Sequence, residues 1–173
     1  MLVALTGTPG TGKNSVAEVL SRKGYYIVHL DRFAEERGLI VGFDEGRGTR
    51  EVDIEALDRE LRGPAKLGIL VGHYAHFLSV SVAIVLRCRP RVLTERLRAR
   101  GWADAKVREN VEAEAIDVIT QEAVEGGAPV FEVDTTSATP SQTADTVLDL
   151  LRGKTKGHEA GSVDWTDEVL SWY

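Results

Sequence analysis

The sequence predicts an α/β fold in which helices flank a five-stranded parallel sheet. Short apolar runs alternate along the chain with longer segments whose apolar residues recur at helical spacing. A glycine-rich turn separates the first apolar run from the first helical segment. This alternation is typical of a doubly wound parallel sheet, because each strand returns to the sheet through a helix. The length of 173 residues suits one domain with small insertions.

Five apolar runs are the expected strands. Each is almost continuously apolar, as expected of a strand that is buried on both faces of a parallel sheet. The first run immediately precedes the glycine-rich turn, and the others separate the helical segments. The strands are expected at residues 2–6, 26–30, 68–71, 82–86 and 130–133.

Six helices are expected from the spacing of apolar residues and from the residues that end each segment. Gly63 and Pro64 end the third helix, because proline cannot continue a helical ladder. Ser137 or Thr139 is the expected N-terminal cap of the sixth. The fifth is the longest. The helices are expected at residues 15–23, 31–38, 54–61, 91–100, 104–125 and 140–152.

Three segments complete the predicted organisation. Residues 39–52 hold three glycines and mixed charges, so an irregular insertion is expected there. The core is expected to span 1–152, followed by a polar, glycine-containing linker at 153–162 and a tail at 163–173. The tail carries Trp165 and Trp172, which either pack on the core or bind a partner.

Composition excludes several classes of protein. A net charge of −6 argues against broad or sequence-specific binding to nucleic acid, although six arginines between residues 87 and 100 leave a local basic patch open. The single cysteine, Cys88, excludes an internal disulfide and is expected to be a small strand-end residue, not a nucleophile. No signal peptide or membrane-length apolar run is evident, so a cytoplasmic location without membrane partners is expected.

Residues 7–15 carry the clearest chemical signal. They read Gly-Thr-Pro-Gly-Thr-Gly-Lys-Asn-Ser and match the phosphate-binding pattern G-x-x-x-x-G-K-[ST] except at Asn14. Glycines such as Gly10 and Gly12 let backbone amides approach phosphate oxygens, and the following helix adds its positive dipole end. Lys13 supplies a point charge for the outer phosphates, and Ser15 follows within the same turn. The sequence therefore predicts an ATP site.

Two segments are placed to close over that site. Phosphoryl transfer requires the exclusion of water, and arginine suits phosphate because its planar fork matches the oxygens. The segment at about 31–62 is expected to hold a nucleoside monophosphate acceptor, and that at about 99–109 is expected to be a lid. Arg100, beside Gly101, is the first candidate for a lid arginine, with Arg96 and Arg108 as alternatives.

Several motifs in order resemble the small archaeal adenylate kinases of the isoenzyme-six type. They are the phosphate loop, Gly72-His73 after the third strand, and Arg100-Gly101. Residues 110–114 (Asn-Val-Glu-Ala-Glu) and 131–136 (Phe-Glu-Val-Asp-Thr-Thr) look like the archaeal branch, as does Val163-Asp-Trp-Thr in the tail. The resemblance covers nearly the whole chain. It implies a phosphate-loop kinase fold and reversible phosphoryl transfer from ATP to AMP, with broad nucleotide tolerance and an ATPase activity.

The resemblance also implies particular roles and partners. It assigns phosphate binding to Gly10, Gly12, Lys13 and Ser15, ATP hydrolysis to the histidine at His73, and a lid contact to Arg100. The family is similar to a factor in late small-subunit ribosome maturation. This implies a pre-30S particle as partner and transient binding to a small-subunit platform protein of the eleventh small-subunit family.

Two departures from the family concern magnesium. The family has Thr or Ser where this chain has Asn14, and an acid before Gly-His where this chain has Val71. Phosphate-loop enzymes use such a hydroxyl and carboxylate to hold magnesium, a hard cation that needs oxygen ligands in strict geometry. Asn14 offers only an amide oxygen as a metal ligand, and Val71 offers none. We therefore expect ATP binding with slow phosphoryl transfer.

Some roles remain open from the residues alone. His73 either orients a water toward the terminal phosphate or bonds a backbone carbonyl as a buried histidine. His76 follows three residues later, but no third ligand indicates zinc. Asp31 and Asp134 either replace the missing carboxylate in part or cap helices. Three functions compete: a nucleoside monophosphate kinase, a nucleotide-dependent assembly factor, and a small-molecule kinase of similar fold such as a shikimate or gluconate kinase.

Overall fold

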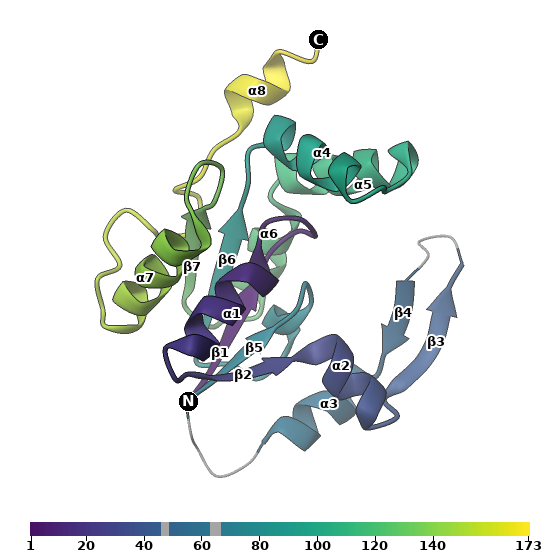
Figure 1. Cartoon of the computed structure of the whole chain (residues 1–173), viewed down its shortest axis with the longest axis vertical. Coiled ribbons are helices and arrows are strands. Elements are labelled where there is room, and N and C mark those ends of the chain that lie inside the picture. The colour runs from purple at the N-terminus through teal and green to yellow at the C-terminus, as the bar shows by residue number, and fades with distance from the viewer. Residues whose placement is uncertain (46–48, 63–66) are drawn as a thin grey trace.

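The computed structural model describes residues 1–45, 49–62 and 67–173, and it confirms the predicted α/β architecture (Figure 1). Five parallel strands form the main sheet in the order β2-β5-β1-β6-β7. Because β1 is central, the turn that follows it lies at the carboxyl edge between two neighbours, where ligands bind in such sheets. The strands are β1 (Leu2–Thr6), β2 (Tyr26–His29), β5 (Gly68–Val71), β6 (Val82–Arg87) and β7 (Val130–Asp134).

Helices cover both faces of the sheet because its strands are apolar on both sides. On one face, α1 (Lys13–Arg22) and α7 (Pro140–Leu151) pack on the odd-numbered residues of β1. On the other, α3 (Ile54–Leu61), the short 3-10 helix η1 (Ala75–Phe77) and α6 (Val118–Glu125) share a second core with Ala4. Thr139 caps α7 through a reciprocal capping box with Gln142, as one of the two predicted caps required.

The insertion at 39–52 is not irregular, so that prediction is wrong. After α2 (Leu30–Glu36), strands β3 (Ile40–Asp44) and β4 (Thr49–Val52) form an antiparallel hairpin that stands apart from the main sheet (Figure 1). Its first strand alternates half-buried and exposed residues, and its register with β4 shifts between Ile40 and Gly42. The glycines and charges concealed this two-residue period. Part of the insertion, residues 46–48, and the Gly63-Pro64 helix stop lie outside the described residues.

The long helix expected at 104–125 is two helices, which corrects a second prediction. The chain leaves α5 (Asp104–Ala115) and turns at Asp117 before α6 begins. Asp117 has a left-handed φ of 59°, and its carboxylate pairs with the Arg87 guanidinium. This tertiary contact ends the helix although the apolar spacing continues. Within residues 1–45, 49–62 and 67–173, no helix is both long and apolar enough to cross a bilayer.

A helical hairpin and the C-terminal segment lie at the carboxyl edge of the sheet. Helices α4 (Pro90–Ala99) and α5 pack on each other around a small core of their own, and α8 (Thr166–Leu170) lies beyond α4 (Figure 1). The expected linker is instead packed on the sheet. Glu132 N donates to His158 O at 2.7 Å, and Phe131 forms an antiparallel bridge with Glu159. The segment therefore extends the sheet at the β7 edge.

The surroundings of the phosphate-loop glycines predict that alanine substitutions lower the free energy of unfolding by different amounts. A Cβ at Gly7 (φ 136°) would lie 2.3 Å from the Leu86 carbonyl oxygen, whereas one at Gly12 (φ 100°) meets nothing within 4 Å. Gly12→Ala should therefore cost roughly 1–2 kcal/mol of unfolding free energy from backbone strain alone. Gly7→Ala should cost about 1–3 kcal/mol more, because the backbone must also move. Urea denaturation of the two variants measures the difference, and equal losses would contradict this packing argument.

Candidate nucleotide site

The phosphate loop joins β1 to α1 and places backbone amides at the end of a helix. Gly10 and Gly12 adopt left-handed φ angles of 95° and 100°, which L side chains rarely occupy. Lys13 begins α1, whose first turn has no acidic residue and no side-chain cap. The first backbone amides of this helix therefore have no side-chain cap and are available to bind an anion. The helix dipole also favours negative charge there.

One cavity of about 610 Å³ brings together all the predicted site residues. His73 enters it after β5, and Arg100 enters from the end of α4. Further lining side chains include Asp31 from α2 and Trp102 from the α4–α5 turn. The predicted members that line the cavity are Gly10, Gly12, Lys13, Asn14, Ser15, His73 and Arg100. The sequence therefore located the cavity, while the role of each residue remains a proposal.

Lys13 is the principal cation of the cavity. Its Nζ donates to the carbonyl oxygens of Gly7 at 2.6 Å and Thr8 at 3.1 Å. Burial lowers the pKa of Lys13 to about 8, although the nearby carboxylate of Glu114 opposes that shift. The ammonium is therefore charged at neutral pH and becomes easier to deprotonate than an exposed lysine.

His73 lies close enough to Lys13 to be affected by its charge. His73 is exposed at the cavity wall, but partial desolvation by the surrounding side chains, reinforced by the Lys13 ammonium, lowers the pKa of His73. The imidazole is therefore neutral at neutral pH and can accept or donate one proton. Its ring lies edge-on to that of Tyr74, with centroids 4.9 Å apart. His73 is thus oriented at the cavity wall and is not a buried structural histidine, in contrast to His76, which is 3% exposed.

A second cavity of about 250 Å³ adjoins the first and shares Asp31 and His73 with it. The hairpin supplies Ile40, Arg50 and Val52, and Tyr74 completes the lining. The buried Tyr74 hydroxyl has no acceptor or donor within ordinary hydrogen-bond distance and angle among the described residues. Burial, followed by the Asp31 charge, raises the pKa of Tyr74, so the group stays protonated. Tyr74 therefore presents a protonated hydroxyl close to Asp31 in the wall of this second cavity.

A third, smaller hollow of about 170 Å³ lies on the other side of the loop. It is bordered by Gly10, Gly12 and Arg100, and by Thr135 and Pro140 after β7. Thr135 donates to the Thr11 carbonyl at 2.8 Å, and the Arg96 guanidinium donates to the Thr135 carbonyl at 2.7 Å. Arg96, an alternative lid residue in the sequence, therefore fixes the loop after β7.

The residues at the cavity do not form an ordinary magnesium site. Asn14 is exposed at the start of α1, and Val71, which is 3% exposed, presents an apolar side chain to the cavity. Asp31 and Glu109 are the acidic residues that line it. No group of three potential metal ligands occurs in the described part of the chain. Neither the hydroxyl nor the strand-end carboxylate that holds magnesium in phosphate-loop enzymes is present.

Asp134 does not replace the missing carboxylate. Its Oδ1 accepts from the Thr136 amide at 2.8 Å and from the Thr136 hydroxyl, so the side chain caps its own turn. It faces a separate hollow near His158. Of the two acidic candidates from the sequence, only Asp31 lines the nucleotide cavity.

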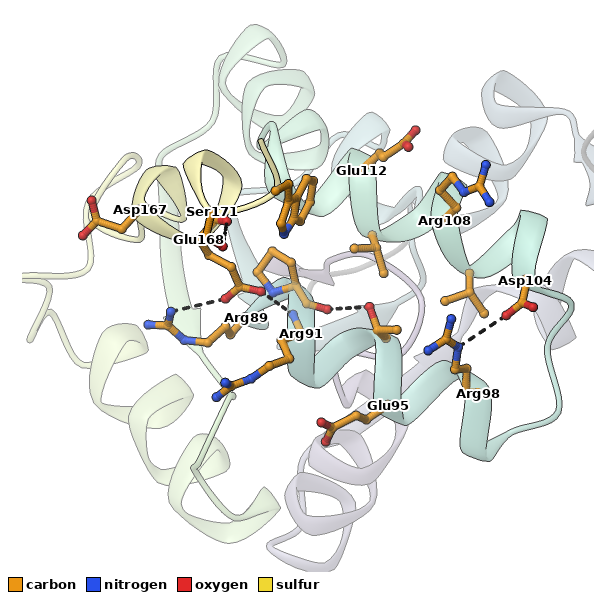
Figure 2. A pocket seen from close by; sticks show the side chains of 15 residues that line it. Arg89, Arg91, Glu95, Arg98, Asp104, Arg108, Glu112, Asp167, Glu168 and Ser171 are labelled. Atoms are coloured by element: carbon orange, nitrogen blue, oxygen red, sulfur yellow. Dashed lines mark hydrogen bonds and ion pairs between the residues drawn. The ribbon is translucent and has the colours of Figure 1, made fainter.

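The six arginines of residues 87–100 do not form one basic patch. Arg87 is buried among carboxylates, Arg89 pairs with Glu168, and Arg98 pairs with Asp104. Figure 2 shows that Arg91 and Arg108 line a groove between the α4–α5 hairpin and α8, together with these pairs. Arg108, the other alternative lid residue, therefore lies in this groove and not in the nucleotide cavity.

The sequence did not identify Glu114 or Thr8 as parts of the site. The Thr8 hydroxyl donates to Glu114 Oε2 at 2.5 Å, directly behind the loop. Glu114 is 2% exposed and follows Val107 and Val111 on the buried face of α5. An acid at an apolar-face position was the available signal, because such a group needs buried partners.

Fold and site together define the class of phosphate-loop nucleotide-binding proteins, and comparison with known proteins agrees. The family described as the AAA domain matches residues 3–117. Among solved structures, the shikimate kinase of Acinetobacter baumannii in complex with shikimate has a TM-score of 0.65 at 15% identity, covering 90% of this chain and 94% of that one. The deoxyadenosine kinase of M. mycoides has a TM-score of 0.54 at 16% identity, covering 89% and 100%. These two show the fold.

Relatives with higher sequence identity show which family within this class the chain belongs to. The protein named "Putative adenylate kinase" of Archaeoglobus fulgidus is 44% identical over 172 residues, covering 98% of this chain and 94% of that protein. The protein of the same name from Methanothermobacter thermautotrophicus is 40% identical over 171 residues, covering 98% and 99%. The chain therefore belongs to the family of archaeal proteins that carry this name.

The lowered pKa of Lys13 predicts a pH dependence of nucleotide binding. Lys13 is charged below about pH 8 and loses its proton as the pH rises through that value. ATP affinity should therefore fall between about pH 7 and pH 9.5, by up to about tenfold per unit above the pKa. Calorimetry at several pH values measures this, and Lys13→Arg is the control because arginine stays charged. Equal affinity of the parent protein across the range would contradict the assignment of Lys13.

Proposed function

We propose that the protein is an adenylate kinase that transfers the terminal phosphoryl group of ATP to AMP, reversibly. The observation that supports this most directly is the pair of adjoining cavities that meet at Asp31 and His73. One contains the phosphate loop and suits a donor nucleotide. The other lies under the β3–β4 hairpin and suits an acceptor. The names of the archaeal relatives support the same reaction.

The roles of the chain's own residues follow from their positions. The amides of the loop and the Lys13 ammonium would hold the donor phosphates, and Ser15 lies within reach of the same cavity. Arg100 would contact the transferring phosphoryl group, because a planar guanidinium stabilises charge on its oxygens. Neutral His73 would orient a water in ATP hydrolysis.

Closure is proposed to involve two segments. Residues 31–62 include the hairpin and would cover the acceptor, while residues 99–109 include Arg100 and Trp102 and would cover the donor. Closing both would exclude water, which protects the donor from hydrolysis and strengthens electrostatic contacts.

The acceptor is tested directly by supplying candidates side by side. ATP is incubated with AMP, with other nucleoside monophosphates, or with shikimate, and ADP formation is measured. We expect transfer to AMP at a rate above hydrolysis. A shikimate site needs cationic groups for a carboxylate, and Arg50 in the acceptor cavity already pairs with Glu35 at 3.3 Å. Transfer to shikimate and not to AMP would overturn the proposal.

Slow turnover is the further part of the proposal, because Asn14 and Val71 do not supply the usual magnesium ligands. The double variant Asn14→Thr with Val71→Asp should transfer phosphate about 10²-fold faster or more, since such electrostatic contributions to catalysis are of that size. Its ATP affinity should change much less. The single variant Asn14→Ala is the matched control. Equal turnover by the parent chain and the double variant would show that the missing ligands do not limit the rate.

The same departures favour one alternative, a nucleotide-dependent assembly factor with weak or no kinase turnover. The isoenzyme-six resemblance would give it an ATPase activity and a role in pre-30S maturation through transient contact with a platform protein. The double-variant experiment separates the two functions. ATP binding without transfer to AMP in the parent chain would favour the assembly factor.

A further inference from the structure

We infer that Trp165, in the C-terminal segment, is a positioning residue for the phosphate loop and acts on it through Glu114. The tail and the nucleotide site are then coupled, so that nucleotide binding at the loop changes the environment of Trp165. The inference rests on the proposed function only in requiring that a nucleotide fills the loop.

The first link is between the loop and α5. Thr8 is the second residue of the loop, and its hydroxyl is 2.5 Å from Glu114 Oε2. Thr8 is 2% exposed and Glu114 is equally buried, so this contact is shielded from water. The Thr8 carbonyl also accepts from Lys13 Nζ at 3.1 Å. Glu114 therefore positions a residue that directly contacts the principal cation of the site.

The second link is between α5 and the tail. The other oxygen of Glu114 accepts from Arg87 Nε at 2.8 Å, from the Cys88 amide at 3.0 Å and from Trp165 Nε1 at 3.3 Å. The indole of Trp165 is 4% exposed, and the guanidinium of Arg89 lies 5.1 Å from its ring centroid. A residue of the tail thus supplies one of the donors that fix the Glu114 carboxylate.

A third contact holds the tail in register with this network. Glu132 pairs with Arg87 through one oxygen, and its other oxygen accepts from the amides of Gly161 at 2.9 Å and Val163 at 3.1 Å. Glu168 then accepts from the Arg91 amide at 2.6 Å, at the edge of the groove seen in Figure 2. The backbone before Trp165 is therefore anchored to β7, and the helix after it is anchored to α4.

These links form one continuous path of hydrogen bonds from Lys13 through Thr8 and Glu114 to Trp165, partly buried at Lys13 and buried from Thr8 onward. A shift of the loop on binding phosphate changes the Thr8–Glu114 contact and therefore the environment of the indole. Coupling of this kind is reciprocal: if a nucleotide stabilises the Trp165 contact, then the Trp165 contact strengthens nucleotide binding by the same factor.

The first experiment measures that factor. Trp165→Phe keeps an aromatic ring and removes the N–H donor, while Trp172→Phe is the matched control in the same tail, 44% exposed and outside the network. ATP affinity is measured by calorimetry well below the unfolding temperature, so that loss of stability does not enter. We expect affinity to fall about fivefold or more in Trp165→Phe and to stay unchanged in Trp172→Phe.

The second experiment keeps Trp165 intact and so does not depend on the folding of its variant. In a background of Trp102→Phe and Trp172→Phe, Trp165 is the only tryptophan, and its emission is followed as ATP is added. We expect the emission to change on binding. We expect Thr8→Val in this background to weaken ATP binding and, at saturating ATP, to abolish the change in emission, because the contact between the loop and Glu114 is lost.

The outcomes separate this inference from the proposed function. Unchanged affinity in Trp165→Phe, together with constant Trp165 emission while ATP binds, would overturn the coupling and leave the proposed function intact. Failure of the parent chain to bind ATP or ADP would overturn both. A fall in affinity of the same size in Trp172→Phe would also overturn the assignment to Trp165.

Discussion

The rest of the structure depends on the ion pairs of the buried Arg87 guanidinium. It is 1% exposed at the end of β6 and pairs with Glu114 from α5, Asp117 from the α5–α6 corner and Glu132 from β7. Burial disfavours the charge, but Glu114 and Glu132 outweigh it and raise the pKa of Arg87. Removing one partner of such a cluster typically costs about 3–5 kcal/mol, because a charge is left buried without compensation.

This cluster of ion pairs determines the geometry of the nucleotide site by holding residues that lie behind the phosphate loop. It fixes the carboxylate to which Thr8 donates, the left-handed turn at Asp117 and the backbone of the tail at Gly161. The phosphate loop is therefore supported by contacts that do not involve Asn14 or Val71. On the proposed function, the contacts that would support phosphate binding are therefore separate from Asn14 and Val71, the two positions that would hold a metal.

The sequence was sufficient to predict the structure where local and tertiary preferences agree. The first strand, the glycine loop and α1 follow from residues 2–22 alone, because apolar burial, glycine φ angles and helical spacing indicate the same structure. The site residues could be grouped for the same reason. All of them except Arg100, which ends α4, follow strands or begin helices at one edge of a parallel sheet.

The wrong predictions for the long helix and for the linker share a different cause: the deciding contact is distant in sequence. Helical spacing continues through Asp117, and only Arg87, 30 residues away, accounts for the break. Residues 153–162 have the composition of a linker, but their backbone bonds Glu132. The position of Glu114 on the apolar face of α5 indicates burial, but its partners Thr8 and Trp165 are distant in sequence and are known only from the structure.

The measurement that tests the central claim most directly is the affinity for ATP with and without magnesium, by calorimetry in chelator and in excess metal. If loop binding is separate from metal placement, the two affinities should agree within about threefold, because Asn14 and Val71 supply neither the hydroxyl nor the carboxylate that holds the cation in phosphate-loop enzymes. An increase of about 10²-fold on adding magnesium would contradict the account. It would mean that other residues at the cavity hold the metal in place of the missing ligands.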